Sequence, residues 1–121
     1  MRNIYCDLHI HIGSAGSKPV KITASRQLTL DTILFNDAIK KGLDVVGVVD
    51  CASPLVIKEL ETMLNEGKIH EHPHGGFKAT NGVMLIAAAE AETKEGIHVI
   101  TYFPNLDSLK NAMHGVDYVF H

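Results

Sequence analysis

Apolar residues along the chain follow two spacings in turn, one typical of strands and the other typical of helices. Strands are predicted at residues 3–10, 43–49, 83–88, 97–103 and 116–120, and helices at residues 29–42, 54–66 and 105–114. Polar, turn-rich residues fill 13–28 and 67–82, which are predicted to be loops. Because strands and helices alternate, we expect an α/β fold with a mostly parallel sheet, alternating helices and right-handed connections.

The ends of the first two predicted helices carry residues that suit those positions. Thr29 or Asp31 can cap the first helix, and Gly42 ends its pattern of apolar residues. Ser53 followed by Pro54 is typical of a second helix start, because serine accepts bonds from free N–H groups and proline fits the first turn. These signals separate the helices from the strands on either side.

Polar and apolar residues alternate strictly at the first predicted strand. The polar members are Asp7, His9 and His11, and the apolar members are Leu8, Ile10 and Ile12. Since successive side chains of a strand point to opposite faces, the two sets are expected on opposite faces. Two imidazoles and a carboxylate suit zinc, manganese or iron. The same pattern fits a strand with one solvated face, so the spacing alone leaves both interpretations open.

Acidic residues follow the next two buried strands. Asp50 comes directly after segment 43–49, and Glu90 and Glu92 come after segment 83–88. In α/β folds the reactive side chains gather at the carboxyl ends of the strands. Charged groups at such positions are costly unless they are paired or bind an ion. A shared cation would account for these acids and the two histidines together, although Glu92 could equally face solvent.

Composition narrows the class of protein. The chain has 121 residues, 45% hydrophobic and 21% charged, which is typical of one soluble domain spanning 1–121. A formal net charge of −3 argues against a general electrostatic grip on nucleic acid. The sequence has no long apolar run and no secretory leader, so we expect a cytoplasmic protein without a membrane partner. Cys6 and Cys51 are expected to be buried thiols or neighbours of a metal rather than a disulfide.

The other histidines have simpler interpretations. His70, His72 and His74 alternate toward two glycines, which favours a solvated loop over a metal-binding tract. His98 lies between apolar residues of a predicted strand, where a buried, hydrogen-bonded histidine would be ordinary. Nothing in the residues themselves decides whether His98 is a ligand.

Five segments form a recognisable set of motifs. They are Asp-Leu-His-Ile-His at 7–11, Lys-Pro-Val-Lys-Ile-Thr at 18–23, Leu-Thr-Leu at 28–30, Gly-Leu-Asp-Val-Val-Gly-Val-Val-Asp at 42–50 and the stretch 90–98. This set resembles the PHP domain (polymerase and histidinol phosphatase), and within it the endonuclease Q-like branch. The similarity continues through Tyr102-Phe103-Pro104 and spans nearly the whole chain.

The resemblance implies a distorted (β/α)7 barrel whose divalent ions hydrolyse phosphoester bonds. Carried over to this chain, it makes His9 and His11 ligands of the first metal, Glu90 a bridge between metals and His98 a ligand of the second. Asp50 stands where the family has its second acidic residue, so Asp50 and Glu90 are the expected catalytic residues and both are expected to bind metal. Asp7, which opens the first motif, completes the expected ligand set.

Three basic residues after the first motif are expected to contact phosphate: Lys18, Lys21 and Arg26. The chain also departs from the family pattern, because Cys51 follows Asp50 where a histidine is usual nearby. A complete barrel of this class needs roughly 200 residues or more, so the chain corresponds to a truncated PHP-like domain and a partial barrel.

The expected function is that of a divalent-metal-dependent phosphoesterase, related to nucleases, that uses zinc, manganese, iron or magnesium. Its substrate would be a phosphorylated small molecule or a nucleic acid. The alternative is a metal-binding relative without turnover. An open half-barrel would also expose an unpaired edge strand, which could pair with a second copy to form a homodimer.

Overall fold

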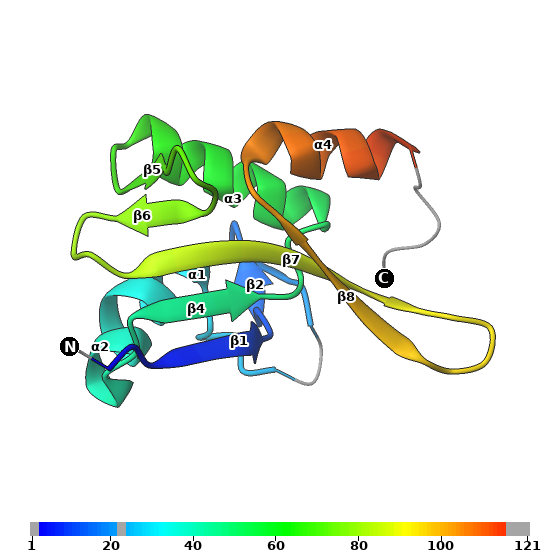
Figure 1. The fold of residues 1–121 in the computed structure, drawn as a ribbon, viewed down its shortest axis with the longest axis horizontal. Helices are drawn as coiled ribbons and strands as arrows, with labels where there is room; N and C mark the ends of the chain where they lie inside the picture. Colours follow the sequence, from blue (N-terminus) through cyan, green and yellow to red (C-terminus); the bar gives the residue numbers. More distant parts are fainter. Residues whose placement is uncertain (1–2, 22–23, 116–121) are drawn as a thin grey trace.

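The computed structural model describes residues 3–21 and 24–115 as a mixed α/β fold. Its main sheet has six strands in the order β1-β4-β7-β6-β5, with β8 also pairing with β7 (Figure 1). Their bounds are β1 Cys6–Ile10, β4 Val45–Val48, β5 Ile69–Glu71, β6 Phe77–Ala79, β7 Met84–Glu92 and β8 His98–Phe103. The predicted strand at 116–120 lies outside the described residues.

The parallel part of the sheet is smaller than expected. β1 pairs with β4 and β4 with β7 in parallel, whereas β5, β6 and β8 join the sheet antiparallel. The sheet is therefore mixed rather than mostly parallel. The reason is that β7 pairs with two segments that return through short turns, which bring the chain back antiparallel without a helical crossover.

One helical stretch connects β1 to β4, where residues 29–42 were predicted to be a helix. It consists of α1 Leu30–Thr32, a π-helix η1 Ile33–Asp37 and α2 Ala38–Lys41. Thr29, rather than Asp31, caps it, because the Thr29 and Thr32 side chains bond reciprocally to each other's backbone N–H groups. Gly42 ends it with a φ of +69°, a conformation that glycine adopts at little cost.

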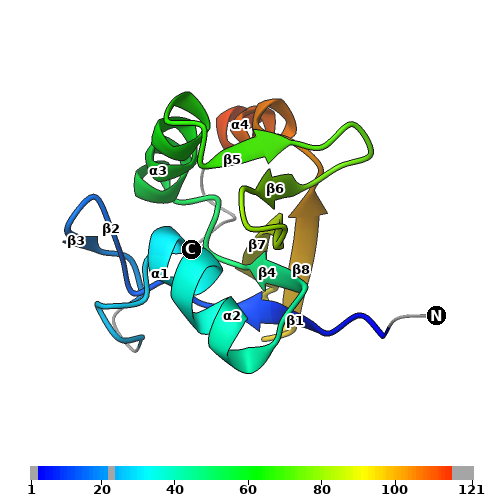
Figure 2. The same cartoon turned by 90° about the vertical axis from the view of Figure 1, so that its left-hand side faces the viewer.

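Two further helices follow the strands. They are α3 Pro54–Asn65 and α4 Leu106–Gly115. Ser53 occupies the N-cap position of α3 with an extended backbone, although its side chain makes no capping bond. Figure 2 shows α1, α2 and α3 along one side of the sheet. None of the helices in the described part of the chain is long and apolar enough to cross a membrane.

Two segments predicted to be loops contain short strands. Within 67–82, β5 and β6 pair antiparallel because Ile69 and Phe77 are completely buried and anchor them. Within 13–28, β2 Ser14–Ala15 and β3 Lys18–Pro19 form a small antiparallel pair. Strands this short, with at most two buried residues each, are too weak a pattern to predict from sequence.

β7 extends beyond the predicted strand 83–88 and includes Glu90. It continues to Glu92, because β8 pairs with it antiparallel through Glu92 and His98. The resulting hairpin extends beyond the rest of the sheet (Figure 1). Glu90 therefore lies within a paired strand, opposite Ile100 of β8. This pairing fixes the backbone of Glu90.

β1 contains an irregularity that changes which side chains share a face. Asp7 pairs with Val46 and Ile10 with Val48, so three residues of β1 span two residues of β4. This is a β-bulge, and it puts Asp7 and Ile10 on the same face. The expected strict alternation is thus wrong: Leu8 is 43% exposed, whereas Ile12 is completely buried.

Candidate metal centre

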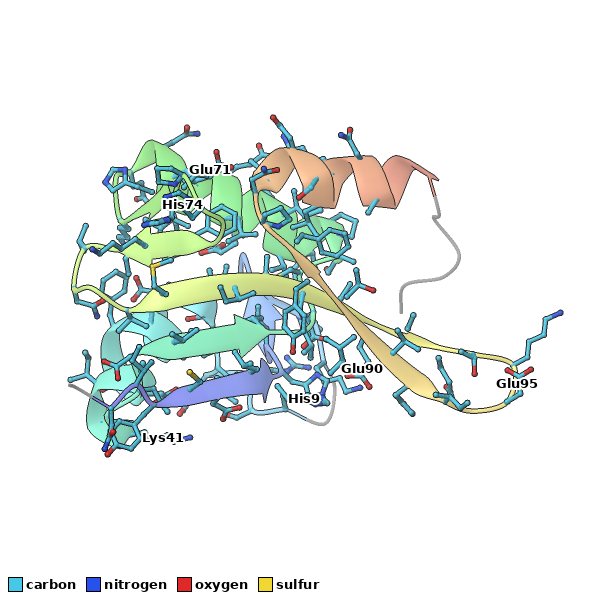
Figure 3. The ribbon with its side chains drawn as sticks, viewed as in Figure 1. His9, Lys41, Glu71, His74, Glu90 and Glu95 are labelled. Atoms are coloured by element: carbon cyan, nitrogen blue, oxygen red, sulfur yellow. The ribbon has the colours of Figure 1, made fainter. Side chains whose placement is uncertain are left out.

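The carboxylate of Glu90 lies among three histidines beside the carboxyl end of β1. Its Oε2 is 3.1 Å from Nε2 of His9 and 3.8 Å from Nε2 of His11. Its Oε1 is 2.6 Å from Nδ1 of His98. Figure 3 shows His9 and Glu90 close together where β1 ends beside β7. Side chains from three regions of the sequence therefore meet here.

Three of these residues form a group that could hold a metal ion. One donor atom each from His9, His11 and Glu90 lies within 4.8 Å of the other two. Two imidazole nitrogens and a carboxylate oxygen fit zinc, manganese or iron. The His9 side chain is 52% exposed and that of Glu90 is 19% exposed, so the group is accessible from one side. Three protein ligands with an open side are typical of catalytic metal sites rather than structural ones.

Asp50 contacts His11 from the side opposite to Glu90. Its carboxylate oxygens lie 3.1 and 3.3 Å from Nδ1 of His11, and one of them accepts a 2.8 Å hydrogen bond from the N–H of Ile12. A carboxylate on Nδ1 fixes the tautomer and leaves Nε2, the atom near Glu90, available to an ion. Asp50 is held in place by a bridge to Ala89 of β7. Its expected roles as ligand and catalytic residue stay predictions.

Glu90 is favoured as an anion. Burial raises its pKa. The hydrogen bond with His98 and the charges of His9 and His11 together lower it by more, so the pKa lies below its ordinary value. The side chain is therefore ionised at neutral pH, which is the form that binds a cation. His98 is 60% exposed, so its interpretation as a buried histidine is wrong, and its contact with Glu90 places it beside the centre.

Asp7 lies outside the group of three donors. The bulge puts it on the face of Ile10 and Val46, and its Oδ1 accepts a 3.2 Å hydrogen bond from the N–H of His9. Asp7 nevertheless lines the same pocket as His9 and His11. Its role as a metal ligand stays a prediction.

The three basic residues expected to contact phosphate belong to the loop beside the first motif. The backbone N–H of Lys21 donates to the carbonyl of Ile12, and the carbonyl of Arg26 accepts from the Ser14 hydroxyl. Lys18 lies in β3, and all three residues are exposed. Among the described contacts, no hydrogen bond or ion pair joins their side chains to the histidines, so phosphate binding stays a prediction.

The second group of histidines lies elsewhere. His70 belongs to β5, and His72 and His74 lie in the turn that follows, with ring centroids 5.6 Å apart. His70 and His74 are exposed, and His72 is half-buried. Figure 3 shows Glu71 and His74 far along the sheet from Glu90. The preferred interpretation of a solvated segment agrees with this exposure, apart from the strand at His70.

The cysteines are both free thiols. Cys51 is buried, and burial raises its pKa to about 12, so it is a packed and protonated thiol. Its backbone N–H bonds to the carbonyl of Ala88. Cys6 is exposed, which contradicts the expectation of a buried thiol, because it lies on the edge strand β1.

Two residues near the centre were missed by the sequence analysis. Gly47 of β4 lies against the bulge, and an interior glycine in a β-branched strand is a recognised sign of close backbone approach. Tyr102 of β8 donates its hydroxyl to the carbonyl of Leu8 over 3.3 Å. No local signal marks Tyr102, because the contact spans 94 positions.

Comparison with solved structures shows that this fold is similar to that of lesion-specific endonucleases. Endonuclease Q in complex with a 27-mer duplex substrate carrying an abasic lesion superposes with a TM-score of 0.70 at 30% identity. The lesion-specific endonuclease PfuEndoQ from Pyrococcus furiosus gives a TM-score of 0.72 at 29% identity. These matches cover 92% and 94% of this chain, but only 25% of each endonuclease.

This chain also covers only a small share of a relative found by sequence. YqxK of Bacillus subtilis, an uncharacterized protein, is 39% identical over 115 residues, which is 91% of this chain and 30% of YqxK. No protein-family model matches the sequence. The chain thus spans about a quarter to a third of the proteins that it resembles.

Proposed function

We propose that this chain forms part of a divalent-metal-dependent phosphoesterase of the PHP type that cleaves nucleic acid. The observation that carries the proposal is the group His9, His11 and Glu90, in a fold similar to lesion-specific endonucleases at about 30% identity. This chain covers only 25% of the endonuclease and 30% of YqxK. The proposal therefore includes a partial barrel and a truncated domain spanning 1–121.

Each residue of the centre would have a defined task. His9, His11 and Glu90 would hold the ion, which when bound supplies positive charge at the phosphate and lowers the pKa of a bound water. Asp50 would fix the tautomer of His11. His98 would favour the ionised form of Glu90 in apo protein through their hydrogen bond, and it would bind a second ion.

The loop beside the first motif would position the phosphate backbone of the substrate. Lys18, Lys21 and Arg26 supply three cationic side chains, and the bonds of Lys21 to Ile12 and of Ser14 to Arg26 hold this loop next to the motif. Since the net charge of the chain is −3, this local group rather than a general basic surface would attract nucleic acid.

Hydrolysis in the presence of manganese or zinc tests the proposal. A duplex with an abasic site, an undamaged duplex and a generic phosphomonoester are incubated with wild-type protein and with the double variant His9→Ala and His11→Ala. We expect metal-dependent cleavage of a duplex by the wild type and loss of it in the double variant. Equal activity of the two proteins would refute the assignment.

The second candidate is a metal-binding protein without turnover. It is favoured by the small share of the related endonucleases that the chain covers, because further ligands can lie in the remainder. Stoichiometric binding of manganese or zinc without cleavage of any of the three substrates would support it. Loss of that binding in the double variant would locate the ion.

We also propose that a homodimer covers the edge of the sheet. β1 has β4 on one side and is the end of the strand order within the described residues. Unpaired edges favour association with another strand. Sedimentation of the protein at micromolar concentration tests this, and a monomer would count against it.

A further inference from the structure

The bulge of β1 isolates one peptide unit next to the metal centre. Asp7 and Ile10 of β1 are paired with residues of β4. Leu8 and His9, which lie between them, have no paired residue on β4. The carbonyl of Leu8 and the N–H of His9 belong to the same peptide group. Both residues are exposed, so this peptide group can bond either to water or to side chains.

Two side chains from different strands supply those partners. The Tyr102 hydroxyl donates to the Leu8 carbonyl over 3.3 Å, and the His9 N–H donates to Oδ1 of Asp7 over 3.2 Å. The peptide group is thus bonded at both of its polar ends.

A third residue brings the peptide close to the sheet. A Cβ atom added at Gly47 would lie 2.8 Å from the Leu8 Cα and 2.9 Å from the Leu8 carbonyl oxygen. Real Cβ atoms do not approach backbone this closely, so the glycine permits the bulge to pack on β4.

The His9 side chain depends on this arrangement. It is 52% exposed on an edge strand, and its ring contacts are with Glu90 and with His11, at a centroid distance of 5.3 Å. Packing therefore restrains the imidazole weakly, and the orientation of its backbone sets where Nε2 points. Metal sites need ligands held within about 0.5 Å of the productive geometry.

We propose that Asp7 and Tyr102 are positioning residues that clamp the Leu8–His9 peptide and so direct His9 toward Glu90. Asp7 thereby acts through the backbone of His9 rather than as a metal ligand. This inference rests on the proposed metal centre at His9, His11 and Glu90. It assigns the first acid of the Asp-Leu-His-Ile-His motif a task different from that of its histidines.

Two substitutions of Asp7 separate the two roles. Asp7→Asn keeps an oxygen that accepts the His9 N–H but removes the carboxylate charge, whereas Asp7→Ala removes both. By calorimetric titration with zinc and with manganese, we expect Asp7→Ala to weaken metal affinity roughly tenfold or more, and Asp7→Asn to bind like the wild type. Equal losses in both variants would identify Asp7 as a ligand and overturn the inference.

Tyr102→Phe tests the other end of the clamp without removing the ring. We expect weaker metal binding and an altered visible spectrum of bound cobalt, which reports ligand geometry. The control is Tyr5→Phe, the same substitution at an exposed tyrosine just before β1, which should leave both readouts unchanged. An unchanged affinity and spectrum in Tyr102→Phe would contradict the clamp.

The double variant His9→Ala and His11→Ala distinguishes the failure of this inference from that of the proposed function. If it binds metal like the wild type, the metal centre itself is wrong and the clamp falls with it. If it loses metal while Asp7→Ala and Tyr102→Phe bind normally, the centre stands and the clamp alone is refuted.

Discussion

Two neighbouring strands, β4 and β1, are built in opposite ways. β4 has a continuous apolar sequence, pairs with β1 on one side and in regular register with β7 on the other, and buries Val46 and Val48 completely. β1 alternates polar and apolar residues, pairs on one side and contains a bulge. β4 contributes buried residues to the core, whereas β1 and the residue just after its end supply His9 and His11, two of the three donors of the metal centre.

The difference shows how a rigid element supports a functional one. β4 gives the bulge a flat surface at Gly47, and Asp50 just after β4 orients His11. Bulges beside active sites commonly redirect a side chain. The geometry of the donors at β1 therefore depends on residues in and after β4, and substitutions in the two strands should have different consequences.

The largest expected effect is on stability in the buried part of the sheet. Leu85 of β7 pairs with β4 and is completely buried, so Leu85→Ala should lower the free energy of unfolding by about 2–5 kcal/mol. The matched substitution Leu8→Ala in β1, where the side chain is 43% exposed, should cost about 1 kcal/mol or less. Urea denaturation measures both. Equal losses would show that β1 is as deeply packed as its neighbours.

Gly47→Ala tests the contact between β4 and the bulge of β1. The added methyl group meets the Leu8 backbone, so we expect a loss of about 1–3 kcal/mol in stability and weaker metal binding. Val45→Ala, in the same strand, should lower stability without changing metal affinity. Thermal unfolding and metal titration give the two readouts. Normal metal affinity in a folded Gly47→Ala protein would separate the bulge from the centre.

His98→Ala should change the charge of the centre with a smaller effect on stability. It removes the hydrogen bond that contributes most to lowering the Glu90 pKa while burial still raises it, so that pKa should rise. The stability that ionised Glu90 contributes in apo protein is present at neutral pH and is lost as the pH falls through the lowered pKa. In the variant this contribution should be smaller, and its loss should be complete at a higher pH. Carboxyl NMR titration measures the shift, and an unchanged pKa would contradict the contact.

The cysteines should show the smallest effect and the clearest contrast in accessibility. A thiol reagent near neutral pH should modify Cys6, which is exposed in β1. It should leave Cys51, which is buried just after β4, unmodified. Because the pKa of Cys51 is raised from 9.0 to about 12, its contribution to stability is complete below pH 9 and is lost as the pH rises toward 12. Mass spectrometry of labelled peptides tests the first point, and modification of native Cys51 would disprove its burial.

The sequence predicted the elements that carry strong, continuous signals. β4 follows from an apolar, β-branched run, and the helical stretch 29–42 follows from helical spacing between Thr29 and Gly42. β5 and β6 were missed because each is only three residues long and buries one or two apolar residues, and the sequence does not show which strand pairs with them. The length of β7 was missed too, because its last residues are paired with β8 and that pairing cannot be seen in the sequence.

The candidate site was predicted in composition but not in geometry. The expected residues His9, His11, Glu90, Asp50 and His98 do lie in contact with one another. The irregular register of β1 was not predicted, and Asp7 bonds to the His9 N–H instead of offering a donor atom to the group of three. Local spacing cannot reveal such a shift, which depends on the Leu8 backbone meeting Gly47 and Tyr102.

Anomalous X-ray scattering from crystals grown with manganese tests the central claim most directly. The account predicts an ion bound by the Nε2 atoms of His9 and His11 and by an oxygen of Glu90, with Asp7 still bonded to the His9 N–H. An ion bound elsewhere in the chain, or crystals with no ion near these three side chains at saturating manganese, would contradict it.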